Sequence, residues 1–222
     1  MDQGLPMLAP PNHRERPHPP GLMEALSLPL AVAACLRFTP EAFAELCAAN
    51  PEAVLELAAD GSLIPVTPTG SETGAQSGAL FFQIKGRANT AGPWKAFDSS
   101  TGFRLPDGSV VSPDAALVSL ERWQSLTAEQ RRGFAPLCPD LVVELASPSE
   151  EGPRGLTALR QKMAAYQRNG ACLGWLLIPA ERAVEVWGPN ESAPTRVDRA
   201  ESLDAESPFP GLTIQLDAIW AG

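Results

Sequence analysis

The order of apolar and polar positions along the chain is typical of a mixed α/β protein. Two short runs, at 140–146 (DLVVELA) and 172–179 (CLGWLLIP), are almost continuously apolar. Runs of this kind are typical of strands that are covered on both faces. The first run therefore predicts a central strand, and the second predicts a strand that pairs with 183–189 (AVEVWGP). Residues 212–220 (LTIQLDAIW) predict a last strand followed by a docking turn.

Helix signals occur before and between these strands. The clearest helical period covers 154–169, and Asn169-Gly170 is a stop signal at its end. Thr39-Pro40-Glu41 supplies an N-cap, a first-turn proline and an early acid, so a helix is expected to begin there. A further helix is expected at 71–90, opened by Ser71.

Turn signals divide the rest of the chain into short strands. Asp60-Gly61 lies between VLELAA and SLIPVT and predicts a hairpin. The turn Pro106-Asp107-Gly108 separates two further expected strands, at 95–105 and 109–118. Two short helical segments, LERWQSL and AEQRRGF, are expected to cross over the sheet. The fold class predicted from these elements is α/β, with a mixed central β-sheet flanked by α-helices.

Length and composition indicate one folded domain preceded by a tail. The chain has 222 residues, which is enough to bury a sizeable core. Residues 1–27 are rich in proline and have no hydrophobic period, so we expect a flexible tail there and a domain at 28–222. The apolar run at 26–36 is too short to span a membrane and contains Pro29, so no membrane association is expected.

Charge and rare residues narrow the chemistry that the domain can perform. The net charge of −9 argues against a broad basic surface for nucleic acid, although a local basic or metal-filled cleft is still allowed. Both histidines, His13 and His18, lie in the tail, which excludes a histidine metal site or a Ser-His-Asp triad in the domain. The cysteines are far apart and lie in apolar surroundings, which favours buried free thiols and a cytoplasmic protein. They are Cys35, Cys47, Cys138 and Cys172.

Two carboxylates lie where a core strand normally has an apolar residue. Asp114 opens the run DAALV directly after Pro113, and Glu144 lies inside VVELA. Burying an ionised carboxylate is costly unless a cation neutralises it, and Mg²⁺ held by two carboxylates would do so. Glu144 alone could equally be a strand-edge acid or the partner of a buried arginine. Asp140 also follows a proline, and we interpret it only as the turn that starts its strand.

Two further charged residues are candidates for the same site. Lys162 lies at the edge of the apolar stripe formed by Leu159, Met163 and Tyr166, so its ammonium either extends to water or points into the acidic site. Glu72 is expected in the first turn of a helix, where an acid stabilises the helix dipole, and this role alone would explain its position. The functional alternative is that Glu72 is a third carboxylate of the metal site. Three more cations could approach phosphates or be solvated, namely Lys85, Arg160 and Arg168.

Several of these segments, in this order, resemble one protein family. VVSPDAALV, CPDLVVELASPSE and LRQKMAAYQRNGACLGWLLIP are similar to the blocks of the Uma-two family of restriction endonucleases, a branch of the PD-(D/E)XK nuclease superfamily. The segment from TPEAFAELC to GSETG resembles that family's N-terminal helix, hairpin and first covering helix. The likeness runs from about residue 28 to the C-terminus.

The resemblance implies a restriction-endonuclease-like fold and Mg²⁺-dependent hydrolysis of DNA, with Mn²⁺ as the alternative ion. By motif position, Asp114 and Glu144 are the metal-binding acids, and Leu145 offers its backbone carbonyl. The motif's lysine is absent because residue 146 is alanine. The matching candidate is Lys162 in the following helix, and Glu72 matches the acid that the first helix directs at the site.

Three hypotheses follow for the function. The first is a metal-dependent endonuclease with Asp114, Glu144, Lys162 and Glu72 in its site, expected to act as a homodimer because cutting a duplex requires two sites. The second is a catalytically inactive domain that keeps the nuclease fold for association with protein or nucleic acid. The third is a structural ion pair between Lys162 and Glu144.

Overall fold

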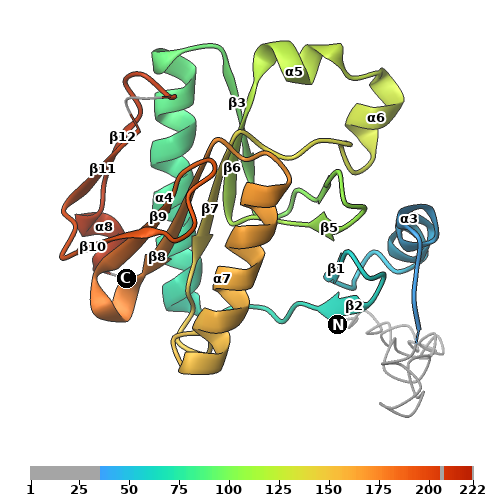
Figure 1. The fold of residues 1–222 in the computed structure, drawn as a ribbon, viewed down its shortest axis with the longest axis horizontal. Coiled ribbons are helices and arrows are strands. Elements are labelled where there is room, and N and C mark those ends of the chain that lie inside the picture. Colours follow the sequence, from blue (N-terminus) through green and yellow to red (C-terminus); the bar gives the residue numbers. More distant parts are fainter. Residues whose placement is uncertain (1–35, 206–207, 222) are drawn as a thin grey trace, which may run out of the picture.

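The computed structural model describes residues 36–205 and 208–221, and its centre is a six-stranded sheet (Figure 1). The strand order is β10-β9-β8-β7-β6-β3. β7 and β8 are parallel and the other neighbours are antiparallel, so the sheet is mixed, as predicted. The strands are β3 (Trp94–Asp98), β6 (Ala115–Ser119), β7 (Leu141–Leu145), β8 (Leu173–Ile178), β9 (Ala183–Trp187) and β10 (Thr195–Asp198).

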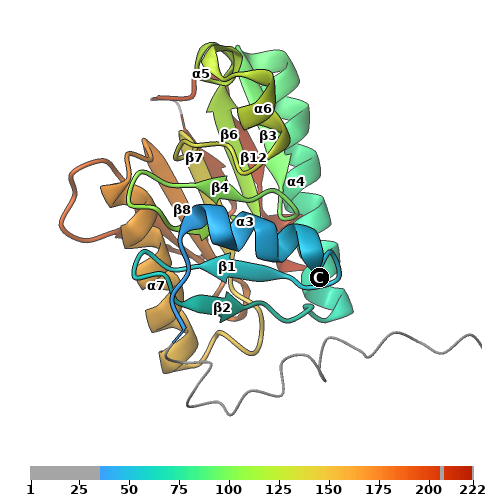
Figure 2. The same cartoon turned by 90° about the vertical axis from the view of Figure 1, so that its right-hand side faces the viewer.

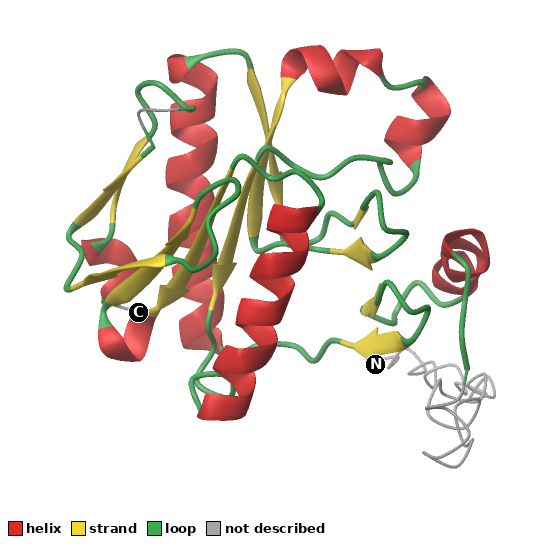
Figure 3. Cartoon of the chain, in the orientation of Figure 1, coloured by secondary structure: helices red, strands yellow, loops and turns green. Residues whose placement is uncertain are grey.

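One long helix covers each face of this sheet (Figure 3). α4 (Ser71–Ala91) packs Leu80 and Ile84 on one face, and α7 (Pro153–Arg168) packs its apolar stripe on the other. Successive residues of β7 serve the two cores in turn, with Val143 toward α4 and Val142 toward α7. This double coverage explains the continuous apolar run, and the alternation puts Glu144 on the α7 face.

A second, smaller sheet lies beside the first and carries the N-terminal helix. Its order is β2-β1-β5-β4, and α3 packs on it through Phe43 against Leu57 and Val110. Figure 2 shows α3, β1 and β2 lying across the molecule between α7 and α4. The elements are α3 (Pro40–Ala49), β1 (Leu55–Leu57), β2 (Leu63–Pro65), β4 (Phe103–Arg104) and β5 (Val110–Val111).

The hairpin and the main helix boundaries agree with the sequence pattern. β1 and β2 pair around Asp60-Gly61, and Gly61 takes the positive φ of 82° that a glycine adopts without strain. Thr39 caps α3 by accepting a hydrogen bond from the Ala42 N–H at 3.2 Å. Asn169 caps α7, and Gly170 has a φ of 101°.

The two strands predicted at 95–105 and 109–118 are each divided between the two sheets, which corrects the prediction of one strand apiece. Asp98 ends β3 by accepting bonds from the backbone and hydroxyl of Ser100, which turns the chain toward β4. Pro113 lies between β5 and β6, where it has no N–H to give to a ladder. The segment 112–114 is therefore the junction between the sheets.

The two short helices do not cross the sheet, which also corrects the prediction. α5 (Leu120–Ser125) and α6 (Ala128–Arg132) connect β6 to β7, and these neighbours are antiparallel, so the connection stays at one end (Figure 1). The C-terminal part adds β10 and β11, which the sequence did not indicate. The remaining elements are η1 (Pro179–Glu181), β11 (Ser202–Asp204), β12 (Thr213–Gln215) and α8 (Asp217–Trp220).

Within residues 36–205 and 208–221, no helix combines the length and the hydropathy needed to cross a bilayer. Cys47, Cys138 and Cys172 are free thiols, as expected. Cys138 is buried as predicted, whereas Cys47 and Cys172 are only half-buried, which corrects the expectation of burial for these two. The tail with its two histidines, and Cys35, lie outside the described residues.

Candidate active site

Asp114 and Glu144 lie next to each other at the junction of the two sheets. The register pairs Ala115 with Val143, and continued by one residue it places Asp114 opposite Glu144. Oδ2 of Asp114 accepts a hydrogen bond of 2.7 Å from the Leu145 N–H. Asp114 is partly exposed, whereas the Glu144 side chain is only 5% exposed. The two acids are therefore adjacent, as the pattern predicted.

Burial of these carboxylates changes their acidity. It raises the pKa of Asp114 above its ordinary value, although the Leu145 N–H and the charge of Lys162 act in the other direction. Burial also raises the pKa of Glu144 to about 8, and Asp114 and Glu56 add to the rise while Lys162 opposes it. A cation beside the two acids lowers both pKa values, so it favours their ionised forms.

Lys162 reaches this pair from α7. Its Nζ lies 3.0 Å from Oε1 of Glu144, 2.9 Å from Oε1 of Glu56 and 3.1 Å from the carbonyl oxygen of Ser112. Burial lowers the pKa of the lysine, but the carboxylates of Glu144 and Glu56 outweigh burial, so the pKa is raised above its ordinary value. Of the two orientations predicted for Lys162, toward water or into the acidic site, the ammonium therefore has the second.

Glu56 is a member of the site that the sequence interpretation missed. It lies on β1, is buried, and accepts the Ser112 N–H at 2.8 Å as well as the ammonium of Lys162. The alternation L-E-L is common in strands that have one face toward solvent, so the sequence alone did not single this acid out. A useful signal was present nevertheless, because an acid inside VLELAA has the same apolar flanks as Glu144 in VVELA.

Tyr166 is the second missed residue, since the helical period placed it simply in the apolar stripe. Its hydroxyl donates a hydrogen bond of 3.0 Å to Oε1 of Glu144, and the side chain is fully buried. Tyr166 lies four residues after Lys162 on α7, so both side chains leave the same side of the helix and reach the same carboxylate oxygen. Burial raises the pKa of Tyr166 well above its ordinary value, so the hydroxyl stays a donor.

The comparisons with known proteins identify the family. The sequence model of Uma2, described as "Putative restriction endonuclease", matches residues 40–217. The chain belongs to the Uma2 family. A crystal structure of a "putative nuclease belonging to DUF820" from Anabaena variabilis superposes with a TM-score of 0.67 at 18% identity, over 83% of this chain and 98% of that one. At this identity the likeness concerns the fold, which is that of a nuclease-like protein. Comparison with curated proteins finds no match.

The residues of this Uma2 protein fit a hard divalent cation. Within the described part of the chain, Oδ1 of Asp114 and Oε2 of Glu144 accept no hydrogen bond, because the contacts of these two acids use their other oxygens. Glu150 adds negative charge near Asp114. Asp114, Glu144 and Glu56 thus face one lysine, and carboxylate oxygens are the ligands that Mg²⁺ prefers. Leu145 ends β7, next to both acids.

Within residues 36–205 and 208–221, no three acidic, histidine or cysteine side chains are arranged so that together they could hold a metal ion. A cation in this Uma2 site would therefore be held by Asp114 and Glu144, with the Leu145 carbonyl and water completing its shell. Glu72 does not join them directly. Its side chain is exposed in the first turn of α4, and it forms no hydrogen bond or ion pair with the described residues. Its role in the site stays a prediction.

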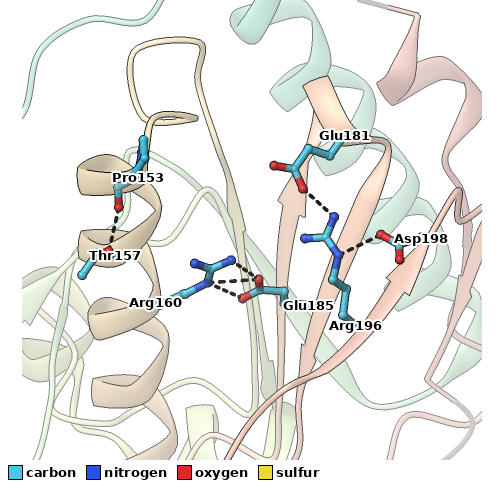
Figure 4. Close-up of polar contacts among 7 residues, drawn as sticks. All are labelled: Pro153, Thr157, Arg160, Glu181, Glu185, Arg196 and Asp198. Atoms are coloured by element: carbon cyan, nitrogen blue, oxygen red, sulfur yellow. Dashed lines mark hydrogen bonds and ion pairs between the residues drawn. The ribbon is translucent and has the colours of Figure 1, made fainter.

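Arg160, one of the cations that could approach a phosphate, is used for structure. The Arg160 guanidinium binds both carboxylate oxygens of Glu185, and the nearby Arg196 joins Glu181 and Asp198 (Figure 4). Arg160 is therefore engaged within the protein.

Asp140 does more than start its strand, which corrects that interpretation. It is buried, accepts the Ser119 N–H at 2.7 Å and forms an ion pair with Arg122. Its carbonyl oxygen accepts the N–H groups of Cys172 and Leu173. Asp140 therefore ties the start of β7 to the end of β6 and the start of β8, away from the acids of the candidate site.

Proposed function

We propose that this Uma2 protein is an endonuclease that hydrolyses DNA phosphodiester bonds with the help of a divalent cation. The observation that carries the proposal is the position of the Lys162 ammonium, 3.0 Å from Glu144, in a site where acids outnumber it. Mg²⁺ is the proposed ion, with Mn²⁺ as the alternative. A homodimer is proposed as the form that cuts both strands, because the described residues of each chain provide one such site and a duplex requires two cuts.

Each side chain has a distinct part in this reaction. A cation held here supplies Lewis acidity toward the phosphate and lowers the pKa of a bound water. Asp114 and Glu144 offer the oxygens that bind it, and Tyr166 keeps Glu144 in its orientation. Lys162 brings a fixed positive charge to the place where the phosphate gains negative charge, although it comes from a helix and not from residue 146 of the strand.

One observation favours a second candidate, a purely structural ion cluster in a non-catalytic domain. The ammonium of Lys162 has three protons and three protein acceptors within 3.1 Å, so it needs no substrate to be satisfied. Such a domain would use the nuclease fold for association with nucleic acid or protein. The same experiment separates the two candidates.

The test is nicking of supercoiled plasmid by the purified full chain with Mg²⁺ or Mn²⁺. Asp114→Asn and Glu144→Gln are expected to lose activity by at least about 100-fold, because even residues that only support metal ligands commonly matter by 10–100-fold. The matched control is Glu185→Gln, which replaces a buried acid on the same sheet that pairs with an arginine, and it should retain nicking at a temperature where it is folded. Absence of nicking by the wild type, or equal nicking by all variants, rejects the nuclease.

A further inference from the structure

The ammonium of Lys162 makes two kinds of contact. Two of its three partners, Glu56 and the Ser112 carbonyl, belong to the small sheet and the segment that leaves it. The third partner, Glu144, is a candidate cation ligand on the main sheet. Lys162 thus has two hydrogen bonds and one ion pair, so a phosphate that approaches the ammonium competes with Glu144 for the third proton.

The two partners on the small-sheet side form a closed frame. Oε1 of Glu56 accepts the Ser112 N–H at 2.8 Å, and both Glu56 and Ser112 accept from Lys162. The pairing of Leu57 with Val110 holds β1 against β5 and so fixes Glu56 beside Ser112. The frame does not depend on Glu144, so it can hold the ammonium when Glu144 is engaged elsewhere.

The contact with Glu144 is the one that a cation must disturb. A divalent ion on Glu144 and an ammonium within 3.0 Å of the same carboxylate repel each other at short range. Glu144 already receives a second donor, the Tyr166 hydroxyl, on the oxygen that faces the lysine. The arrival of the ion therefore weakens the bond from Lys162 to Glu144 and leaves the two frame contacts in place.

We propose that Glu56 is a positioning residue that, with the Ser112 carbonyl, holds Lys162 while the lysine exchanges its third contact from Glu144 to the substrate phosphate. This inference rests on the proposed function. In the resting site the lysine and the acids neutralise one another, and the exchange of the third contact is the step that makes the site able to bind the substrate phosphate. It also assigns the third acid of the site to the β1–β2 hairpin, independently of Glu72.

The first test measures Mn²⁺ affinity by calorimetry, which does not depend on activity. Lys162→Met is expected to bind Mn²⁺ about tenfold more tightly than the wild type, because a charge that competes for Glu144 is gone. Glu56→Gln is expected to bind about fivefold more weakly, because Lys162 then relies on Glu144 more strongly. The control Lys85→Met makes the same charge change at an exposed position on α4 and should leave the affinity unchanged.

The double variant distinguishes positioning from direct ligation. With Lys162→Met present, Glu56 has lost its cationic partner, and Glu56→Gln should change the affinity by less than about twofold. An equal loss in both backgrounds would make Glu56 a cation ligand in its own right and overturn the proposal. Unchanged affinity in Lys162→Met would overturn it as well.

The second test follows the lysine itself. The chain has three lysines, Lys85, Lys95 and Lys162, so spectra of lysine-labelled protein are simple to assign. The side-chain signal of Lys162 should shift on addition of Mg²⁺ in the wild type and lose its protection from exchange with water in Glu56→Gln. Nicking with no shift at Lys162 overturns the inference and leaves the proposed function standing. A shift without nicking rejects the proposed function alone.

Discussion

Two buried glutamates on the same face of the central sheet have opposite surroundings. Glu144 on β7 and Glu185 on β9 both pair with Leu176 of β8, so they lie in one row beneath α7. Residues 160 and 162 of α7 are about 200° apart around the helix, so Arg160 reaches one glutamate and Lys162 reaches the other from opposite flanks. One buried acid is thus paired with an arginine in a structural contact, and the other is paired with a lysine in the candidate active site.

The difference lies in how completely each acid is satisfied. At Glu185, a guanidinium binds both carboxylate oxygens, so one acid meets one cation in a bidentate pair. At Glu144, the donors from Lys162 and Tyr166 share one oxygen, and Asp114 and Glu56 compete for the same positive charge. Burial of an acid in a strand is thus common to both sites, and the excess of acid over base belongs only to the candidate active site.

The largest expected effect is on the free energy of unfolding. Glu185→Gln removes the charge that the Arg160 guanidinium needs, and since the Glu185 side chain is only 4% exposed we expect a loss of about 2 kcal/mol. Glu144→Gln removes repulsion from Asp114 and Glu56, so its free energy of unfolding should stay within about 1 kcal/mol of the wild type or rise. Urea denaturation without divalent ions gives both values. If Glu144→Gln lowered the free energy of unfolding more than Glu185→Gln does, the proposed difference between the two sites would be wrong.

The sequence predicted the scaffold around both glutamates well. The runs at 140–146 and 172–179 are continuous because α4 and α7 cover both faces, and the period of α7 placed Lys162 at the edge of its buried stripe. These features are local, and each follows from the side-chain period of one element.

The missed parts depend on contacts between distant segments. Glu56 and Lys162 are 106 positions apart, and their contact requires the small sheet to face α7. That arrangement follows from the division of two expected strands at Asp98 and Pro113, which an apolar count over 95–105 and 109–118 does not reveal. The hydroxyl contact of Tyr166 was hidden because an aromatic residue in a buried stripe needs no polar partner to be explained.

A divalent cation should act on one of the two sites alone. Binding to the folded state raises the free energy of unfolding by RT ln(1 + [L]/Kd), which is about 1.4 kcal/mol at ten times Kd. We expect Mg²⁺ or Mn²⁺ to raise the melting temperature of the wild type and of Glu185→Gln, and to leave Glu144→Gln and Asp114→Asn unchanged. Thermal melts of each protein with Mg²⁺ or Mn²⁺, with Ca²⁺ and with EDTA measure these changes in melting temperature. Equal stabilisation of all four proteins would place the cation elsewhere.

The smallest expected effect concerns Tyr166, the donor that Glu144 has in addition to its lysine. Tyr166→Phe removes the hydroxyl and leaves the packing of the ring, so the loss of one buried hydrogen bond should lower the free energy of unfolding by about 1 kcal/mol. Nicking should fall about tenfold, since Glu144 is less firmly oriented toward a cation. Tyr166→Leu is the companion variant, because it also removes ring packing. If Tyr166→Phe changed stability but left both Mn²⁺ affinity and nicking intact, the Tyr166 hydroxyl would have no part in orienting Glu144, and the two buried glutamates would differ in their cation and in the acids beside it.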